Sequence, residues 1–154
     1  MNNSGGFMNI SEYLTEKTIT FINEKDKYSV INTLVDKAFE LGKIVDKEEF
    51  KKAIEARESL ISTGIGLGIA VPHAKLAGIK DFFVIISILE TPVQWDSIDY
   101  QPVSLVFLIG GPSDRQTQYL KLLSQIILVA KNEAKRKILI KAKDIDTVIK
   151  QFQG

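Results

Sequence analysis

Two nearly uninterrupted apolar runs constrain the fold of this chain more than any other feature of its sequence. Residues 82–89 read FFVIISIL and residues 103–109 read VSLVFLI, so β-branched and aromatic side chains dominate both runs. A strand with one solvent-facing side alternates polar and apolar residues, whereas these runs barely alternate. We therefore predict two central β-strands that other elements cover on both faces.

Helical periodicity in the rest of the chain supplies elements that can cover such strands. An apolar stripe at helical spacing runs through residues 26–41 and stops at Gly42, a residue suited to ending a helix. A second helix is predicted to begin at Asp46, because Glu49 follows three residues later in a capping-box pattern. Three more helices are predicted. One starts at Pro112-Ser113, with Gln116 three residues after the serine, and extends to Ala130; the others lie at residues 133–141 and from residue 144 onwards.

Shorter elements complete the predicted architecture. Residues 18–21 are typical of an edge strand. Residues 90–92 and 96–102 are typical of a structured loop, with a short extra strand at residues 93–95 between them. Because helices precede, separate and follow the strands, we expect an α/β fold in which α-helices flank a mixed β-sheet.

Chain length and the N-terminal residues indicate a single domain. A chain of 154 residues fits one domain, which we place at residues 8–154 after a flexible leader at residues 1–7. The leader lacks the basic start and apolar centre of an export signal. The apolar runs are also far shorter than the roughly 20 residues of a membrane-spanning helix. We therefore expect a cytoplasmic protein that does not insert into a membrane.

Charge and cysteine content exclude several classes of function. Twenty basic and nineteen acidic residues leave a formal net charge of +1, which provides no general attraction for nucleic acid. The absence of cysteine excludes disulfides, thiolate catalysis and zinc sites of the cysteine type. With a single histidine in the chain, we predict neither a metal site nor a cofactor.

The only histidine, His73, ends a predicted glycine-rich loop, residues 62–73, with the sequence STGIGLGIAVPH. The glycines allow close approach of another molecule, and Pro72 restricts the backbone just before the histidine. A neutral imidazole held in this way is a suitable nucleophile for phosphorus. The alternative is that His73 has no special role, as holds for most lone histidines. The segment matches neither a Walker A motif nor a dinucleotide-binding fingerprint.

Arg57 lies near this segment on the predicted second helix. Phe50, Ile54 and Arg57 follow an i, i+4, i+7 stripe that is expected to face inward. An inward arginine needs an anion, which is either a carboxylate such as Glu58 or a bound phosphate; a snorkelling arginine is the third interpretation. Asp96 and Asp99 lie in a turn-rich segment, so we interpret them as backbone caps rather than as an acid–base pair.

Several motifs taken together resemble the enzyme IIA domain of the phosphoenolpyruvate-dependent sugar phosphotransferase system, of the fructose/mannitol class and including its nitrogen-regulatory members. They are Arg57-Glu58, residues 62–66 and 68–73, and residues 89–93, 95–99 and 101–103. The resemblance covers nearly the whole chain after residue 8. It implies a mixed sheet flanked by helices, with His73 phosphorylated by the phosphocarrier HPr or a relative. His73 would then pass the phosphoryl group to a IIB partner.

The resemblance also implies roles for the neighbours of His73. Arg57 is expected to stabilise the transferring phosphoryl group, because a guanidinium binds phosphate oxygens in a bidentate manner. Ser62 and Thr63 are expected to bind phosphate or support the site. Ile65 and Leu67 are expected to contact partner proteins.

Three residues depart from the usual pattern of that family. Leu67 stands where the family usually has asparagine, Ala74 where glycine is common, and Tyr119 where many members have a second active-site histidine. The phenol of Tyr119 can donate a hydrogen bond to a phosphoryl oxygen, but it cannot carry the positive charge of an imidazolium. We therefore expect a supporting role for Tyr119 and a differently tuned transfer.

Three functions remain open from the sequence. The first is a phosphocarrier in sugar uptake, with an HPr-like donor and a IIB acceptor. The second is a regulatory binding module of the nitrogen type, whose affinity for a target protein changes when His73 is phosphorylated. The third is a scaffold that binds partners without efficient transfer, which only Leu67 and Tyr119 favour.

Overall fold

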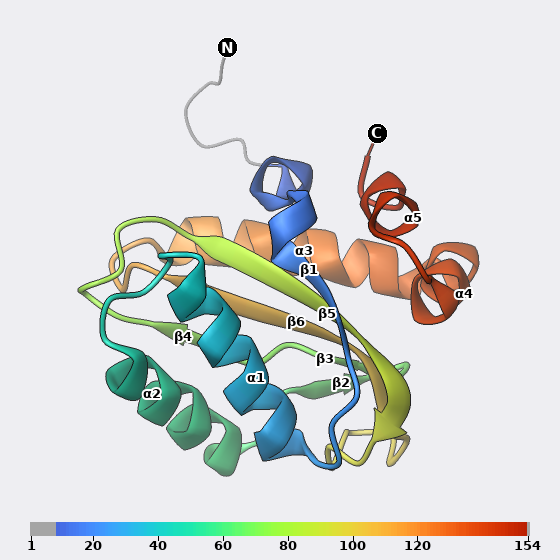
Figure 1. Cartoon of the computed structure of the whole chain (residues 1–154), viewed down its shortest axis with the longest axis horizontal. Helices are drawn as coiled ribbons and strands as arrows, with labels where there is room; N and C mark the ends of the chain where they lie inside the picture. Colours follow the sequence, from blue (N-terminus) through green and yellow to red (C-terminus); the bar gives the residue numbers. More distant parts are fainter. Residues whose placement is uncertain (1–8, 154) are drawn as a thin grey trace.

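A computed structural model describes residues 9–153, in which helices cover both faces of one mixed sheet (Figure 1). The sheet of this described part has six strands in the order β1-β5-β6-β3-β2, and β4 also pairs with β6. The central strands β5 and β6 are antiparallel, whereas β1 is parallel to β5, and β3 and β4 are parallel to β6. The strands are β1 Ile19–Ile22, β2 Gly64–Gly66, β3 Ile69–Ala70, β4 His73–Lys75, β5 Phe83–Val93 and β6 Val103–Gly111.

The helices divide between the two faces of the sheet. On one face lie α1 (Lys27–Glu40) and α2 (Lys47–Leu60). On the other lie α3 (Gln116–Lys131), α4 (Glu133–Lys141) and α5 (Ile145–Lys150), together with the first of two short 3-10 helices, Ile10–Tyr13 and Glu16–Thr18. The predicted α/β class, a mixed sheet flanked by helices, is confirmed.

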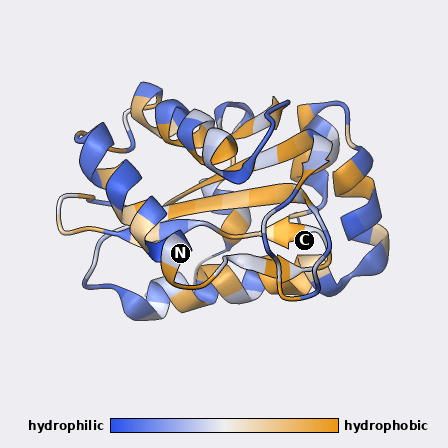
Figure 2. Ribbon diagram, turned by 90° about the horizontal axis from the view of Figure 1, so that it is seen from below, coloured by the Kyte–Doolittle hydropathy of each residue, from blue (hydrophilic) through white to orange (hydrophobic). Residues whose placement is uncertain are grey.

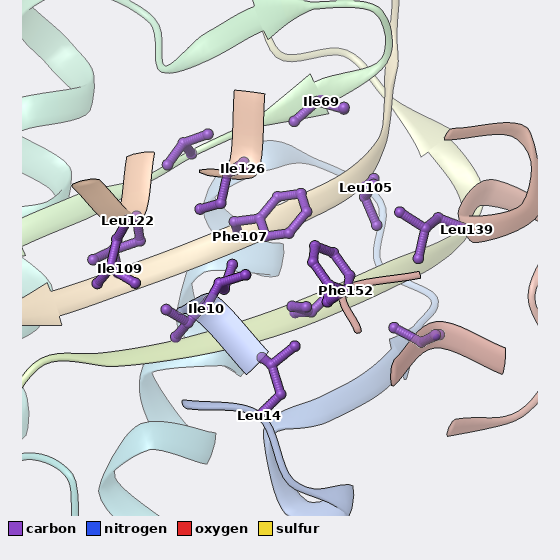
Figure 3. Packing of buried hydrophobic residues seen from close by; sticks show 14 of the residues in the cluster. Ile10, Leu14, Ile69, Leu105, Phe107, Ile109, Leu122, Ile126, Leu139 and Phe152 are labelled. Carbon is purple, nitrogen blue, oxygen red and sulfur yellow. The ribbon is translucent and has the colours of Figure 1, made fainter. Parts of the chain in front are cut away.

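The two apolar runs form the middle of the molecule, as predicted. Val84, Ile86 and Ile88 of β5 face the cluster of α3, α4 and α5, which also contains Phe107 and Phe152 (Figure 3). Alternate β5 residues face the opposite cluster under α1 and α2. The ribbon coloured by hydropathy shows the resulting apolar centre between helices that carry hydrophilic outer faces (Figure 2). Burial on both faces explains why polar residues are almost absent from these strands.

Local capping residues begin α1 and α2 where the sequence predicts them. The carboxylate of Asp46 accepts a hydrogen bond from the Glu49 N–H at 3.0 Å, and Asp26 caps α1 in the same way. Gly42 follows α1 with a φ of 74°, a conformation that glycine adopts without steric cost. The five helices predicted from periodicity are therefore all present within the described residues. The predicted start of the third helix at Pro112-Ser113 is wrong, because α3 begins at Gln116 after Arg115, which makes no side-chain cap.

The predicted loop at residues 90–92 is wrong, because β5 continues through these residues to Val93. Along this stretch β5 advances from Ile88 to Val93 while β6 advances only from Leu105 to Val103. The extra residues form an irregularity that accommodates Pro92, which has no N–H to donate. The predicted separate strand at residues 93–95 is also wrong: Val93 ends β5, and Trp95 is fully buried beyond it.

The remaining predictions concern the edges of the sheet and the chain ends. The predicted edge strand at residues 18–21 is confirmed by β1, which pairs on one side only with β5. The predicted leader at residues 1–7 lies outside the described residues. None of the helices within residues 9–153 is both long enough and apolar enough to cross a membrane.

Candidate functional site

His73 is the first residue of β4, where the register pairs it with Ile109 of the central strand β6. Its Nδ1 lies 2.9 Å from the carbonyl oxygen of Val71. Since a carbonyl can only accept, Nδ1 carries the proton and donates it to Val71. The other ring nitrogen, Nε2, is then left with a free lone pair.

The imidazole of His73 is also kept neutral. Burial lowers the pKa of His73 below its ordinary value of 6.5, and the nearby charges of Arg57 and Lys75 lower that pKa further. The Val71 hydrogen bond and the Glu58 carboxylate oppose this shift. A neutral ring is the nucleophilic form, so the site favours attack by Nε2 at neutral pH.

An open pocket of about 200 Å³ surrounds His73 and brings together most of the residues singled out in the sequence. Sequence reasoning missed Val71 and Leu123; the signal for Leu123 is its i+4 spacing from Tyr119 on α3. Leu67 does not line the pocket. The lining residues are Arg57, Ser62, Thr63, Ile65, Val71, His73, Tyr119 and Leu123.

Tyr119 reaches the pocket from the first turns of α3. Its ring centroid lies 5.1 Å from that of His73, with an angle of 40° between the ring planes. Burial raises the pKa of Tyr119 above its ordinary value of 10.0, although Arg57 opposes the shift. The phenol therefore stays protonated and can donate a hydrogen bond.

Arg57 is half-buried at the edge of the pocket. The residue of this turn that faces inward is Glu58, so the predicted inward position of Arg57 is wrong. Phe50, Ile54 and Glu58 follow an i, i+4, i+8 stripe, which fits an inward helix face as well as the i+7 spacing of Arg57 does. The guanidinium of Arg57 donates to the carbonyl oxygen of Ile61 at 2.7 Å. Within the described part of the chain it makes no ion pair, so the idea that Glu58 neutralises Arg57 is wrong.

Glu58 is 3% exposed and anchors a group of paired side chains that we call the Glu58 network: Lys27, Glu58, Ser62, Thr63 and Trp95. The ammonium of Lys27 lies 3.3 Å from Glu58 Oε2, and Thr63 donates its N–H to the same oxygen at 2.8 Å. The Thr63 hydroxyl donates to Glu58 Oε1 at 2.5 Å and accepts from the Trp95 indole at 3.2 Å.

The Glu58 network limits what Ser62 and Thr63 can do in the pocket. The Ser62 hydroxyl donates to the Trp95 carbonyl oxygen at 2.7 Å, and the Thr63 hydroxyl proton is committed to Glu58. Each hydroxyl therefore has its only proton in use. Of the two roles expected for these residues, the geometry favours support of the pocket wall over direct donation to a phosphate.

The segment predicted as a glycine-rich loop is instead a β-hairpin, in which β2 and β3 pair antiparallel. The φ angles of Leu67 and Gly68 at its turn are 60° and 77°, the combination that two-residue hairpin turns of type I′ require. Gly64 is needed for space, because a Cβ there would lie 2.2 Å from Ser97 Oγ. The error arose because strands of two or three residues leave little pattern in a sequence.

Leu67 thus occupies a left-handed conformation that asparagine tolerates better than leucine does. This is a physical reason for an asparagine at the position. Asp99 supports the turn, since its carboxylate accepts from the N–H of Leu67 at 3.0 Å and of Gln101 at 3.1 Å. The interpretation as a backbone cap is confirmed for Asp99. It is wrong for Asp96, whose carboxylate caps no backbone N–H within the described residues, although its own N–H donates to Gln94 Oε1 at 3.4 Å.

Comparisons with known proteins identify the family of the chain and agree with its fold. The family model described as phosphoenolpyruvate-dependent sugar phosphotransferase system, EIIA 2, matches residues 12–154. The fructose-specific EIIABC component of Bacillus subtilis is 38% identical over 92% of this chain, which spans only 22% of that relative's length. The nitrogen regulatory protein of Escherichia coli is 36% identical over 90% of this chain and 83% of its own length.

A solved structure shows the same architecture. The nitrogen regulatory protein IIA-Ntr of Neisseria meningitidis superimposes with a TM-score of 0.87 at 26% identity, covering 94% of this chain and 99% of that protein. The family match extends over nearly all of the described residues, including every residue that lines the His73 pocket. The chain therefore belongs to the EIIA 2 family of the phosphoenolpyruvate-dependent sugar phosphotransferase system, as its sequence motifs predicted.

Proposed function

We propose that this EIIA protein is a phosphocarrier whose His73 Nε2 accepts a phosphoryl group from an HPr-like protein and passes it to a IIB partner in sugar uptake. The observation that carries the proposal is the hydrogen bond from His73 Nδ1 to the Val71 carbonyl oxygen. This bond fixes the proton on Nδ1 and leaves Nε2 as the nucleophilic ring atom. The pocket around His73 also contains the guanidinium of Arg57.

The transfer of the phosphoryl group to His73 requires no separate acid or base. The lone pair of Nε2 forms the new phosphorus–nitrogen bond while the bond between phosphorus and the donor's imidazole breaks, and its electron pair leaves with the donor. The Nδ1 proton stays in place, so the phosphorylated ring of His73 carries a formal positive charge. The Val71 carbonyl oxygen stabilises that charge through the same hydrogen bond. Transfer to the IIB partner reverses these events at His73.

The residues around His73 would each have a separate role in the transfer. Arg57 would stabilise the negative charge that spreads over the phosphoryl oxygens during transfer, since no carboxylate within the described residues neutralises it. The phenol of Tyr119 would donate a hydrogen bond to one of these oxygens. Ser62 and Thr63 would hold the pocket wall through the Glu58 network.

Partner proteins would approach over the open side of the pocket. Ile65 lines the pocket and is 38% exposed, and Leu67 at the hairpin turn is 45% exposed. Exposed apolar side chains beside a reactive atom suit docking surfaces that bind and release successive partners. We propose Ile65 and Leu67 as contacts for both the HPr-like donor and the IIB acceptor.

A regulatory role of the nitrogen type is the second candidate. It is favoured by the likeness to nitrogen regulatory proteins, which extends over most of their length as well as of this chain. In that role, phosphorylation of His73 would change the affinity for a target protein by adding about −1.5 to −2 charges at the pocket. The binding-only scaffold suggested by Leu67 and Tyr119 gains no further support.

Phosphorylation in a reconstituted system tests the proposal. The protein is incubated with phosphoenolpyruvate, enzyme I and HPr, and an acid-labile adduct is sought by intact mass spectrometry in alkaline solution. The proposal predicts an adduct on the wild type and none on His73→Ala. An unmodified wild type, in a reaction that phosphorylates another EIIA protein, would contradict it. Added IIB protein should then discharge the adduct if the sugar-uptake role holds.

A further inference from the structure

Lys75 lies on the same side of β4 as His73, because side chains two residues apart on a strand share one face. Ala74 between them points to the opposite side, where it is buried in the cluster under α1 and α2. The face that carries His73 and Lys75 meets the N-terminal part of α3. Both side chains are half-buried, and both contact the same tyrosine of that helix.

The charge of Lys75 is held only by neutral groups. Its Nζ lies 4.8 Å from the centroid of the Tyr119 ring and donates a hydrogen bond to the amide oxygen of Gln116, the first residue of α3. Within residues 9–153, Lys75 forms no ion pair with a carboxylate. An uncompensated ammonium therefore lies beside the tyrosine that also packs on the His73 ring, although Lys75 does not itself line the His73 pocket.

We propose that Lys75 is a further catalytic residue, whose ammonium leaves Gln116 to bind a phosphoryl oxygen on His73 Nε2 together with Arg57. The inference rests on the proposed phosphocarrier function. It assigns the second positive charge of the site to Lys75, since the neutral phenol of Tyr119 cannot supply one.

The chemistry of the phosphoryl group favours two cations. The group brings up to two negative charges, which spread over three oxygens in the loose transition state. Arg57 can bind two of these oxygens through its planar guanidinium, whereas an ammonium acts as a point charge on a flexible stem. Gln116 is neutral, so it holds the ammonium close to the site without cancelling its charge. Lys75 therefore suits an oxygen that Arg57 leaves free.

Rate measurements with matched lysine variants test this role. Lys75→Gln keeps a polar side chain but removes the charge, and Lys75→Arg keeps the charge. Lys80→Gln removes a charge from an exposed lysine that lines a different hollow, beside Gly42 and Phe82. The initial rate of phosphorylation by phospho-HPr should fall about tenfold or more in Lys75→Gln, because a hydrogen bond to a charged group is lost. Lys75→Arg should recover most of the rate, and Lys80→Gln should match the wild type.

A second measurement separates an electrostatic role from a structural one. Because His73 is the only histidine, its ring protons can be followed without ambiguity in an NMR titration. Lys75 contributes to the lowered pKa of His73, so that pKa should rise in Lys75→Gln and stay unchanged in Lys80→Gln. Full phosphorylation of Lys75→Gln after long incubation would show that the variant is folded.

The outcomes distinguish this inference from the phosphocarrier proposal. A wild type that is phosphorylated on His73, with Lys75→Gln equally fast, would overturn the role of Lys75 and leave the proposed function intact. A slow Lys75→Gln with an equally slow Lys75→Arg would also overturn the role, because charge would then not be the cause. A wild type that is never phosphorylated would overturn both.

Discussion

The charged residues on the two sides of His73 differ in whether their charges are compensated. On one side, the Glu58 network buries a carboxylate whose oxygens accept from Lys27 and from two donors of Thr63. On the other, the cations Arg57 and Lys75 contact only neutral oxygens and an aromatic ring. The first side is complete without a ligand, whereas the second leaves two positive charges uncompensated.

This difference separates the residues that stabilise the fold from the residues that can act on a phosphoryl group. A buried charge is tolerated only when it is paired, so the Glu58 network is a structural feature that holds the end of α2 to the start of β2. Unpaired cations at a half-exposed rim cost little, because water solvates them until an anion arrives. Substitutions on the first side should therefore change the free energy of unfolding, and those on the second side should change the transfer rate.

The largest expected effect on stability comes from Glu58→Gln. This variant leaves the ammonium of Lys27 without its counter-ion, and breaking a buried pair costs about 3 kcal/mol. Urea denaturation of the variant should show this loss. Glu55→Gln on the same helix is the matched control and should stay within about 0.5 kcal/mol of the wild type. An equally stable Glu58→Gln would remove the distinction between the two sides.

Arg57→Ala should affect the transfer rate instead. We expect a fall of about 100-fold in the phosphorylation rate, because charge-assisted contacts to the phosphoryl oxygens are lost. The free energy of unfolding should fall by only about 1 kcal/mol, from loss of the hydrogen bond to the Ile61 carbonyl oxygen, since Arg57 forms no ion pair in the described chain. Rapid-quench kinetics and urea denaturation on the same preparation measure both. A normal rate would refute the role of Arg57.

The hairpin turn offers a smaller effect with the opposite sign. Leu67 has a φ of 60°, so Leu67→Asn should raise the free energy of unfolding by about 1 kcal/mol. Leu67→Ala keeps the unfavourable backbone conformation and serves as the control, for which no gain is expected. Thermal denaturation of the three proteins compares them. A gain in Leu67→Ala equal to that in Leu67→Asn would point to side-chain exposure rather than backbone strain.

The smallest expected effect is the pH dependence that His73 gives to the free energy of unfolding. Its pKa is lower in the folded protein than the ordinary value of 6.5, so the unfolded chain binds the proton more tightly. The contribution to stability is thus fully present above pH 6.5 and is lost as the pH falls below that value. Urea denaturation of wild type and His73→Gln across this pH range isolates the contribution of His73 to the free energy of unfolding, since the two proteins share all other titrating groups. A difference that stays constant with pH would contradict the lowered pKa.

Local patterns and non-local contacts differ in how far the sequence could predict them. The central strands and the caps at Asp26 and Asp46 depend on neighbouring residues, so they were predictable. The continuation of β5 past Pro92 and the short hairpin strands depend on pairing with distant residues, which a single sequence does not reveal. The fold and the family could therefore be predicted from the sequence, whereas the end of β5 and the short hairpin strands could not.

The site residues follow the same division. His73 and Arg57 were found through their motifs, but the exchange of inward positions between Arg57 and Glu58 was not, because both spacings fit a helix face. The commitment of the Ser62 and Thr63 hydroxyls depends on Glu58 and Trp95, and the latter is remote in sequence. For Lys75 the only signal was its position two residues after His73.

Identification of the phosphorylated ring nitrogen tests the central claim most directly. Protein labelled with ¹⁵N and phosphorylated through HPr gives ring signals from a single histidine, so long-range ¹H–¹⁵N spectra assign both nitrogens of His73. Phosphorus on Nε2, with the proton retained on Nδ1, is the predicted result. Phosphorus on Nδ1, or on any residue other than His73, would contradict the account.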